Sequence, residues 1–167
     1  MEQIIYIVDL DGTLYDNRHR AHLMPTGDKR NDTEAWKQFN GACRGDTPIE
    51  EMLLTVKTLI ANGEDVRFLT GRGQSAYLPT MYRLHNDVGI SRTLIKLQMR
   101  PMDDHRSAAD FKSDALRRLL KTYGTKKFTC FEDDPTVCAA FEALSDRVIV
   151  VQVDSLCAAV IEGDSNK

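Results

Sequence analysis

Five short apolar runs recur along the chain, and amphipathic segments separate them. The runs cover residues 4–8, 65–70, 93–99, 127–131 and 147–153, and they have the length and side-chain types of strands. Strands that alternate with helices predict βα units and a mainly parallel sheet. We therefore expect an α/β fold of the Rossmann-like kind, with helices on both faces of the sheet.

The clearest helix is predicted over residues 47–62. Thr47 can cap it, Pro48 takes the first helical position, and an apolar stripe runs from Ile49 to Ile60. A second amphipathic helix is expected over about 107–123.

The remaining helical patterns are weaker. A helix over 73–87 should be kinked or divided by Pro79. The short amphipathic stretch 32–43 predicts a small helical lid, within an insertion of about 15–46 that follows the first strand. Residues 154–167 predict a short helix and a frayed tail.

Length and composition favour one ordinary domain over residues 1–167, because 42% hydrophobic and 28% charged residues are typical of globular proteins. The four cysteines form no C-x-x-C pair, which indicates reduced, packed thiols. No apolar run approaches the roughly 18 residues that span a bilayer, and the N-terminus carries Glu2 instead of lysines. We expect a cytoplasmic protein with no membrane partner, and the oligomeric state stays open.

The first predicted strand runs directly into Asp9 and Asp11. Residues two apart on an extended strand point the same way, so both carboxylates should face one space. Crowded carboxylates separate each other's pKa values, which suits one to act as nucleophile or ligand and the other as acid. Asp-Gly also begins hairpins, but no alternating partner strand follows. A calcium loop would need glycine where Leu14 stands.

A lysine, Lys112, falls within the apolar stripe of the predicted helix 107–123. An inward lysine needs an anionic partner, or its chain must extend out to water. Extension to water is the commoner outcome for a lone lysine. Because acidic strand ends are available here, we favour a functional charge role.

Three consecutive acids, Glu132, Asp133 and Asp134, follow the predicted strand 127–131. Asp134 can cap the helical pattern that follows Pro135. Glu132 and Asp133 lie closer to the strand and are better placed as ligands. Carboxylate oxygens suit Mg²⁺, which keeps several waters and bridges to phosphate.

These pieces together resemble the haloacid dehalogenase (HAD) superfamily of phosphohydrolases. The four motifs read "DLDGT", "LTGR", "FKSDAL" and "FEDDP", in the required order and over nearly the whole chain. The resemblance implies a Rossmann-like HAD fold and a phosphatase that uses Mg²⁺.

Longer stretches, such as "DLDGTLYDNRHRAHL", "AWKQFNGAC" and "LQMRPMDDHRSAADFK", resemble the phosphatase domain of bacteriophage polynucleotide kinase and its stand-alone relatives. That family removes 3′-phosphates from nucleic-acid ends. This sequence has Glu132 where the family has the first Asp of its acidic motif, and Asp134 where the family has Arg. It contains no G-x-x-x-x-G-K-[ST] phosphate loop, so the kinase half is missing.

The resemblance implies a role for each motif. Asp9 would form an aspartyl-phosphate, and Asp11 would protonate the leaving alkoxide and then activate water. Thr70 and Lys112 would bind the phosphoryl oxygens. Mg²⁺ would be held by Asp9, by the backbone carbonyl of Asp11 and by Asp133, with Glu132 or Asp134 assisting. The candidate substrate-binding residues are Gly12, Thr13, Arg18, Arg20, Gly71, Arg72, Arg100 and Arg106.

The arginines of that set, with the neighbouring histidines, predict a cationic rim that suits a nucleic-acid 3′-phosphate end or a nucleotide equally well. Trp36 could stack on a base, although packing is the commoner role for a lone tryptophan on such a helix. Three functions stay open. They are a 3′-phosphatase of nucleic-acid ends, a nucleoside monophosphate phosphatase, and a non-catalytic binding module, against which the intact catalytic motifs argue.

Overall fold

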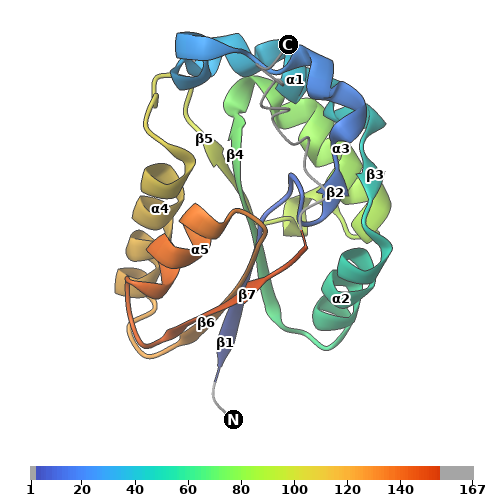
Figure 1. Ribbon diagram of the computed structural model, residues 1–167. Coiled ribbons are helices and arrows are strands. Elements are labelled where there is room, and N and C mark those ends of the chain that lie inside the picture. The colour runs from blue at the N-terminus through green and yellow to red at the C-terminus, as the bar shows by residue number, and fades with distance from the viewer. Residues whose placement is uncertain (1–2, 155–167) are drawn as a thin grey trace.

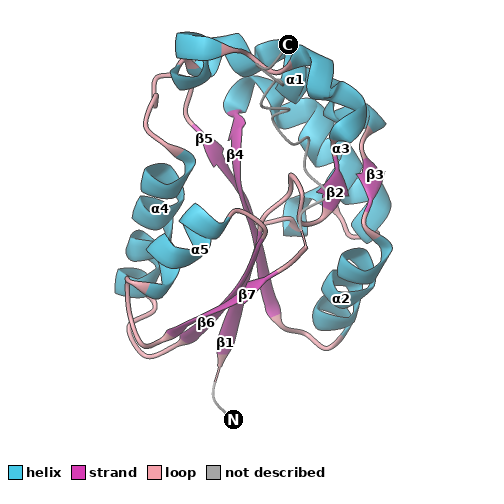
Figure 2. Cartoon of the chain, in the orientation of Figure 1, coloured by secondary structure: helices cyan, strands magenta, loops and turns pink. Residues whose placement is uncertain are grey.

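The computed structural model describes residues 3–154. Its main sheet has five strands, all parallel, in the order β5-β4-β1-β6-β7. The strands are β1 (Ile4–Val8), β4 (Asp65–Gly73), β5 (Leu97–Arg100), β6 (Lys127–Glu132) and β7 (Val148–Gln152). Figure 2 shows this sheet running through the middle of the molecule. The predicted α/β fold with a parallel sheet is confirmed.

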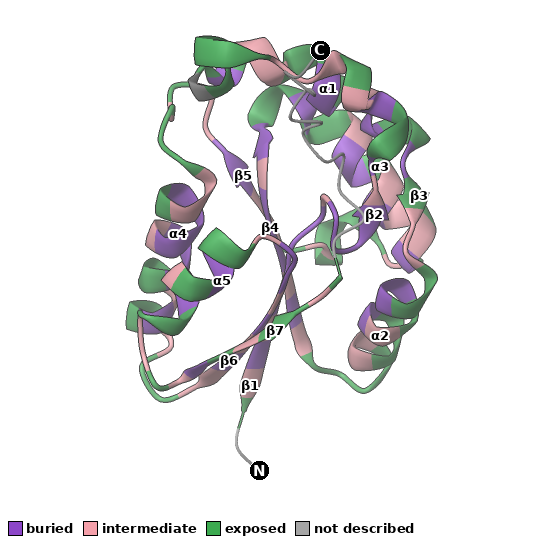
Figure 3. Ribbon diagram, viewed as in Figure 1, coloured by how far each residue is buried: buried purple, intermediate pink, exposed green. Residues whose placement is uncertain are grey.

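Helices cover both faces of the sheet (Figure 1). Along β1, Ile5 and Ile7 point to one face and Val8 to the other, as the two-residue repeat of a strand requires. The first face packs against α4 (Ala108–Thr122) and α5 (Pro135–Glu142), and the second against α2 (Glu50–Ala61) and α3 (Tyr77–Val88). Figure 3 shows the resulting burial of the helix faces that meet the sheet.

Two strands differ from their predicted bounds. β4 continues to Gly73, and its pairing with β5 is irregular between Thr70 and Gly73. β5 begins only at Leu97, which pairs with Phe68, because the preceding Arg92–Leu94 forms an exposed 3-10 turn (η6). The longer β4 therefore includes Arg72 at the carboxyl edge of the sheet.

The predicted start of the helix at Thr47 is wrong. Thr47–Pro48 forms a short strand, β3, that pairs antiparallel with β2 (Tyr15–Asp16), and α2 begins at Glu50. Ile49 is the capping residue, with an extended backbone and no side-chain cap. Since Pro48 pairs with Tyr15 in this small sheet, it cannot also serve as the first helical residue.

Pro79 neither kinks nor divides its helix. The turn η5 (Gln74–Ala76) precedes α3, which starts at Tyr77, so Pro79 lies in the first turn, where a backbone N–H has no helical partner to lose. α4 agrees closely with the prediction, and the side chain of Ser107 caps it by accepting a hydrogen bond from the Asp110 N–H.

The lid segment between β2 and β3 is a chain of short helices instead of one amphipathic helix over 32–43. Its elements are η1 (Arg18–Leu23), η2 (Gly27–Asn31), η3 (Thr33–Trp36), α1 (Lys37–Gly41) and η4 (Ala42–Gly45). Thr33 begins a new short helix, η3, and its hydroxyl donates a hydrogen bond to the backbone oxygen of Asp104 at 2.6 Å. The lid is therefore tied to the loop that leads into α4.

Cys43, Cys130 and Cys138 are buried free thiols, as the sequence suggests. Within residues 3–154, the structure has no helix of the length and apolarity needed to cross a membrane. The helix and tail predicted over 154–167 lie outside the described residues, apart from Asp154.

Candidate active site

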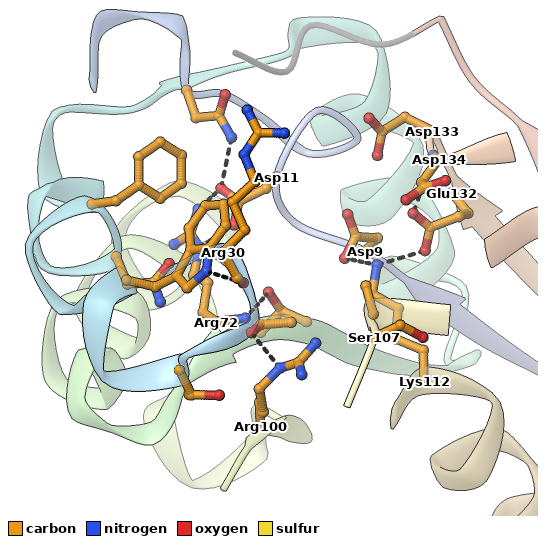
Figure 4. Close-up of a pocket in the computed structure, with 18 of the residues that line it drawn as sticks. Asp9, Asp11, Arg30, Arg72, Arg100, Ser107, Lys112, Glu132, Asp133 and Asp134 are labelled. Carbon is orange, nitrogen blue, oxygen red and sulfur yellow. Dashed lines mark hydrogen bonds and ion pairs between the residues drawn. The ribbon is translucent and has the colours of Figure 1, made fainter. Parts of the chain in front are cut away.

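The polar strand ends meet at a cavity of about 710 Å³ on the carboxyl edge of the sheet. Figure 4 shows side chains from β4, α4 and the segments after β1 and β6 pointing into it. Ten of the residues predicted from the sequence line it: Asp9, Asp11, Thr70, Gly71, Arg72, Arg100, Arg106, Lys112, Glu132 and Asp133. The convergence follows from the parallel sheet, in which all carboxyl ends lie at one edge.

Lys112 sits between two carboxylates at the floor of the cavity (Figure 4). Its Nζ lies 2.7 Å from Asp9 Oδ1 and 2.7 Å from Glu132 Oε2. All three side chains are almost fully buried. The inward lysine on α4 is therefore satisfied by acidic strand ends and does not extend out to water.

Asp9, Glu132 and Asp133 form a compact acidic cluster, in which one oxygen from each lies within 4.8 Å of the others. Asp133 is oriented by Thr13, whose hydroxyl donates to Asp133 Oδ1 at 3.1 Å. Asp134 caps α5 by accepting from the Thr136 N–H at 2.8 Å. Of the two acids that flank Asp133, the one that joins the cluster is Glu132.

This donor set fits a hard divalent cation, because three buried carboxylates offer only oxygen ligands. Burial, together with the charge of Glu132, raises the pKa of Asp9 well above its ordinary value, although Lys112 opposes the shift. Burial acts to lower the pKa of Lys112, but Asp9 and Glu132 outweigh it and raise that pKa. The single positive charge of Lys112 does not balance three carboxylates, so a bound cation could balance the remaining negative charge.

Asp11 belongs to a different network from Asp9. Arg72 donates to its two oxygens from Nε at 2.8 Å and from Nη2 at 2.7 Å, and Asn17 Nδ2 donates at 3.2 Å. Arg20 Nη2 also donates to Asp11 Oδ1. Burial would raise the pKa of Asp11, but the two arginines outweigh it and hold the pKa well below its ordinary value. Asp9 and Asp11 share the cavity, as expected, with opposite electrostatic surroundings.

Asp46 binds both arginines, and no motif in the sequence pointed to it. Its buried carboxylate accepts from Arg20 Nε at 2.7 Å and from Arg72 Nη2 at 2.7 Å. His19 Nε2 lies 2.9 Å from the same group. Asp46 directly precedes β3, so the small β2/β3 sheet sets its position beneath the lid.

Arg18 and Arg20, predicted as substrate-binding residues, do not line the cavity. Arg18 is exposed, lies outside the cavity, and pairs with Asp16 at 2.6 Å. Arg20 is fully buried, and Nη1 donates to the Phe39 backbone oxygen at 2.8 Å. Both differ from the prediction because nearby acids and carbonyls in the lid bind them.

Arg100 and Arg106 do reach the cavity from the opposite side. Arg100 donates from Nε to the Gly71 backbone oxygen at 3.1 Å, and its Nη1 contacts the backbone oxygen of Arg106. Arg106 is exposed, and its Nη2 pairs with Asp104 at 2.7 Å. The cations that line the cavity are thus Arg100, Arg106, the lid's Arg30 and the buried Arg72, which is itself paired with Asp11 and Asp46.

Gly12 and Thr13 shape the loop after β1 and do not line this cavity. Gly12 has a φ of 85°, a left-handed conformation that favours glycine, and its N–H donates to the Tyr15 oxygen at 2.9 Å. This turn places Asp11 beside the lid arginines and Thr13 beside Asp133.

The lid contributes a mostly apolar wall, of which the sequence indicated only Trp36 as a possible contact for a base. Met24, Trp36, Phe39 and Asn40 all line the cavity. Trp36 is half-buried, donates from Nε1 to the Arg30 oxygen at 2.9 Å, and meets Phe39 edge to face, with ring centroids 5.4 Å apart. The packing role favoured for Trp36 is present, and its ring also borders the cavity.

Solved structures with the same fold include a chain of the Pnkp1/Rnl/Hen1 complex, with a TM-score of 0.62 and 22% identity over 92% of this chain and 47% of that chain. A hydrolase from Pseudomonas syringae has a TM-score of 0.61 and 15% identity, covering 90% of this chain and 84% of its own. The Class C acid phosphatase from Bacillus anthracis has a TM-score of 0.57 and 18% identity, covering 84% and 55%. This protein spans about half the length of that chain of the Pnkp1/Rnl/Hen1 complex.

No curated protein matches the sequence. Residues 2–129 match the family described as HAD superfamily, subfamily IIIB (Acid phosphatase). That match covers more than half of the 167 residues, and it agrees with the acidic cavity at the carboxyl edge of the sheet. The protein therefore belongs to the HAD superfamily, subfamily IIIB (Acid phosphatase).

Proposed function

We propose that this protein is a Mg²⁺-dependent phosphomonoesterase that works through an aspartyl-phosphate and removes 3′-phosphates from nucleic-acid ends. The observation that carries the proposal is the pair Asp9 and Asp11 in one cavity, the first bonded to Lys112 and the second to two arginines. This arrangement supports a nucleophilic role for Asp9 and an acid–base role for Asp11.

Asp9 is the nucleophile in this proposal. Its Oδ1 is bonded to Lys112, which fixes the carboxylate at the end of β1. An oxygen of Asp9 bonds to phosphorus as the bond from phosphorus to the leaving oxygen breaks, and water then cleaves the aspartyl-phosphate to release inorganic phosphate. Lys112 and Thr70 contact the phosphoryl oxygens from the floor of the cavity.

Asp11 is the general acid and base. It gives a proton to the leaving 3′-oxygen in the first step and takes one from the attacking water in the second. Arg72 and Arg20 fix its position. Because they also stabilise the ionised form, Asp11 needs to gain a proton before the first step.

Asp9, Glu132 and Asp133 would hold the metal, together with the backbone carbonyl of Asp11. Mg²⁺ bound there offsets the repulsion between an anionic carboxylate and an anionic phosphate ester. Thr13 supports this site by orienting Asp133.

The choice of a nucleic-acid end is supported by the resemblance to the phage end-healing phosphatases, and by the cations Arg100, Arg106 and Arg30 that line the cavity. Two of the structures with the same fold are chains of Pnkp1/Rnl/Hen1 complexes, one of which is described as an RNA repair complex. A phosphate backbone that leaves the cavity would pass these cations.

A nucleoside monophosphate is the second candidate substrate. The placement of Arg18 and Arg20 favours it, because Arg20 is buried against Asp46 and neither arginine lines the cavity, which leaves fewer cations there for a polyanionic backbone. Asp134 also adds a negative charge at the mouth.

The deciding experiment measures phosphate release, with Mg²⁺, from a 3′-phosphorylated oligonucleotide, its 5′-phosphorylated counterpart, and the 3′- and 5′-nucleoside monophosphates. We expect the highest kcat/KM for the 3′-phosphorylated oligonucleotide, with a strong dependence on salt. Higher kcat/KM for free mononucleotides would make the protein a nucleotidase.

Asp9→Asn and Asp146→Asn form a matched pair of variants for this assay. Asp9→Asn should abolish turnover while the protein stays folded, because the amide cannot attack phosphorus. Asp146 is exposed at the opposite edge of the sheet, just before β7, so Asp146→Asn should keep full activity. Phosphate release by the Asp9→Asn protein would overturn the assignment of the nucleophile.

A further inference from the structure

Strand β7, at one edge of the sheet, is covered on one of its two faces. Val148 is buried in the cluster that includes α4 and α5, and Val150 packs against that cluster. Ile149 and Val151 point to the other face and are 55% and 39% exposed. Figure 3 shows β7 as more exposed than the central β1. Parallel sheets are normally covered on both faces, so this open apolar face is a candidate binding surface.

The register of the sheet identifies the open face. Val8 pairs with Phe131, and Phe131 pairs with Val151, so all three side chains point the same way. Val8 is fully buried in the cluster that includes α2 and α3, whereas Phe131 is only half-buried. Within residues 3–154, these two helices therefore cover β1 but leave the same face of β7 open.

A groove of about 770 Å³ lies between the open face and the start of α2. Its apolar lining comes from two elements of the sheet and from α2: Phe131, Val151, Val153, Ile49 and Met52. A groove with this lining suits apolar side chains.

Hydrogen bonds fix two residues of the groove. The Val153 N–H donates to the Glu132 backbone oxygen at 3.0 Å, which extends the pairing of β7 with β6. Thr13 also lines the groove, and its hydroxyl donates to Asp133 Oδ1 at 3.1 Å. A segment that binds here meets a preformed surface and loses little affinity to ordering of the protein around it.

Acidic side chains border the groove and limit what can bind there. Glu50 and Glu51 are exposed at the start of α2, and Asp154 is exposed just after β7. A second copy of the chain, bound about a two-fold axis, would bring the same acids against each other, because each copy presents the same patch. An uncharged apolar segment avoids this repulsion.

The chain supplies such a segment next to the groove. Asp154 lines the groove, and the next seven residues read SLCAAVI, of which six are apolar and none is charged. The first charged residue after Asp154 is Glu162. Seven residues span at most about 25 Å when fully extended, so residues 156–161 stay within reach of the groove.

We propose that the groove binds residues 156–161 of the same chain, with their apolar side chains against Phe131, Val151 and Val153. This contact buries the open face of β6 and β7 within one molecule. The proposal does not depend on the phosphatase activity, and its test needs no substrate.

The test uses Cys157, which belongs to the segment, as its probe. The thiols of Cys43, Cys130 and Cys138 are buried in the fold. The native protein is treated with an aromatic disulfide, and the signal that Cys157→Ser removes gives the rate for Cys157. We expect this rate to be about tenfold or more below that of a synthetic peptide of residues 155–163, because the segment must leave the groove before its thiol reacts. Equal rates would overturn the proposal.

Two matched pairs of variants locate the contact. Val151→Glu places a charge in the groove, whereas Leu94→Glu places one on an exposed leucine of η6, outside the groove. Val160→Asp changes the segment, and Asn166→Asp adds the same charge beyond its apolar residues. Val151→Glu and Val160→Asp should each raise the Cys157 rate to about that of the peptide, and the two controls should keep the slow rate. If Val151→Glu does not fold, Val160→Asp tests the same contact from the other side.

Two other outcomes would refute the proposal. Slow labelling that is unchanged in all four variants would mean that the segment binds elsewhere. Slow labelling that is lost on dilution, together with a dimer in gel filtration, would assign the groove to a second copy of the chain. Slow labelling of a monomer, independent of protein concentration and lost in Val151→Glu and Val160→Asp, supports the contact within one chain.

Discussion

Asp46 Oδ2 and Arg72 Nη2 form an ion pair of 2.7 Å in which both side chains are fully buried. Arg20, also buried, joins the pair through Asp46 Oδ1 at 2.7 Å. Both arginines also form ion pairs with Asp11. Asp46 therefore balances the charge of two arginines that would otherwise depend on Asp11 alone, so the network should matter for stability as well as for positioning.

Replacing Asp46 by Asn should destabilise the fold strongly. Breaking a buried ion pair from one side costs about 3–5 kcal/mol, because a buried charge is left unbalanced. For a chain of this size we expect Tm to fall by roughly 6–20 °C. Asp16→Asn, which breaks the exposed pair with Arg18, should shift Tm far less. Similar shifts for the two variants would show that the Asp46 network adds no special stability.

Lys112→Met should make the stability of the protein depend on Mg²⁺. Without the lysine, Asp9 and Glu132 lose the cation that lies 2.7 Å from each, and repulsion among the buried acids destabilises the folded state. A divalent ion that binds the folded acids counteracts this repulsion. Thermal unfolding should therefore show a larger rise of Tm on adding Mg²⁺ for Lys112→Met than for wild type. Equal rises would argue against Asp9 and Glu132 as ligands.

The sequence predicted most of the sheet and the floor of the cavity because local patterns carry that information. The apolar run 4–8 ends at Asp9, and the parallel sheet brings the end of β1 beside those of β4 and β6. Lys112 was predictable because the helical repeat of α4 placed it in an apolar stripe. An inward lysine needs an acidic partner or a path to water, and here the neighbouring strand ends supply the acids.

The lid could not be predicted in the same way, because tertiary contacts decide its structure. Thr33 bonds to the backbone of Asp104, far along the chain, and Asp46 is recognisable only once Arg20 and Arg72 lie beside it. Pairing of β2 with β3 likewise overrode the helix-start pattern at Thr47 and Pro48.

Asp65 should make a pH-dependent contribution to stability. It accepts hydrogen bonds from Arg67 at 3.0 and 3.1 Å and from Lys96 at 2.6 Å. Burial would raise the pKa of this carboxyl, but the hydrogen bonds from Arg67 and Lys96 outweigh it and lower the pKa. A depressed folded-state pKa gives stability above the unfolded pKa of about 4, which is lost as the pH falls through the folded-state pKa.

The difference in Tm between wild type and Asp65→Asn measures this contribution. It should be constant from about pH 7 to pH 5 and shrink below about pH 4, as Asp65 takes up its proton. The difference cancels the titration of the other acids, which both proteins share. A gap that persists at the lowest pH would mean that Asp65 acts through hydrogen bonds to its neutral form and not through its charge.

Asp11→Asn should slow poor leaving groups far more than good ones. An alkoxide such as a 3′-oxygen needs a proton as its bond to phosphorus breaks, whereas p-nitrophenolate needs almost none, so a general acid matters only for the first. We expect kcat for a 3′-nucleotide to fall by about 10²–10⁴-fold and kcat for p-nitrophenyl phosphate to fall much less. Hydrolysis of the aspartyl-phosphate also uses Asp11, so single-turnover release of p-nitrophenolate isolates the first step. If both substrates lose the same factor in that step, Asp11 acts only by holding Arg20 and Arg72, and the proton must come from elsewhere.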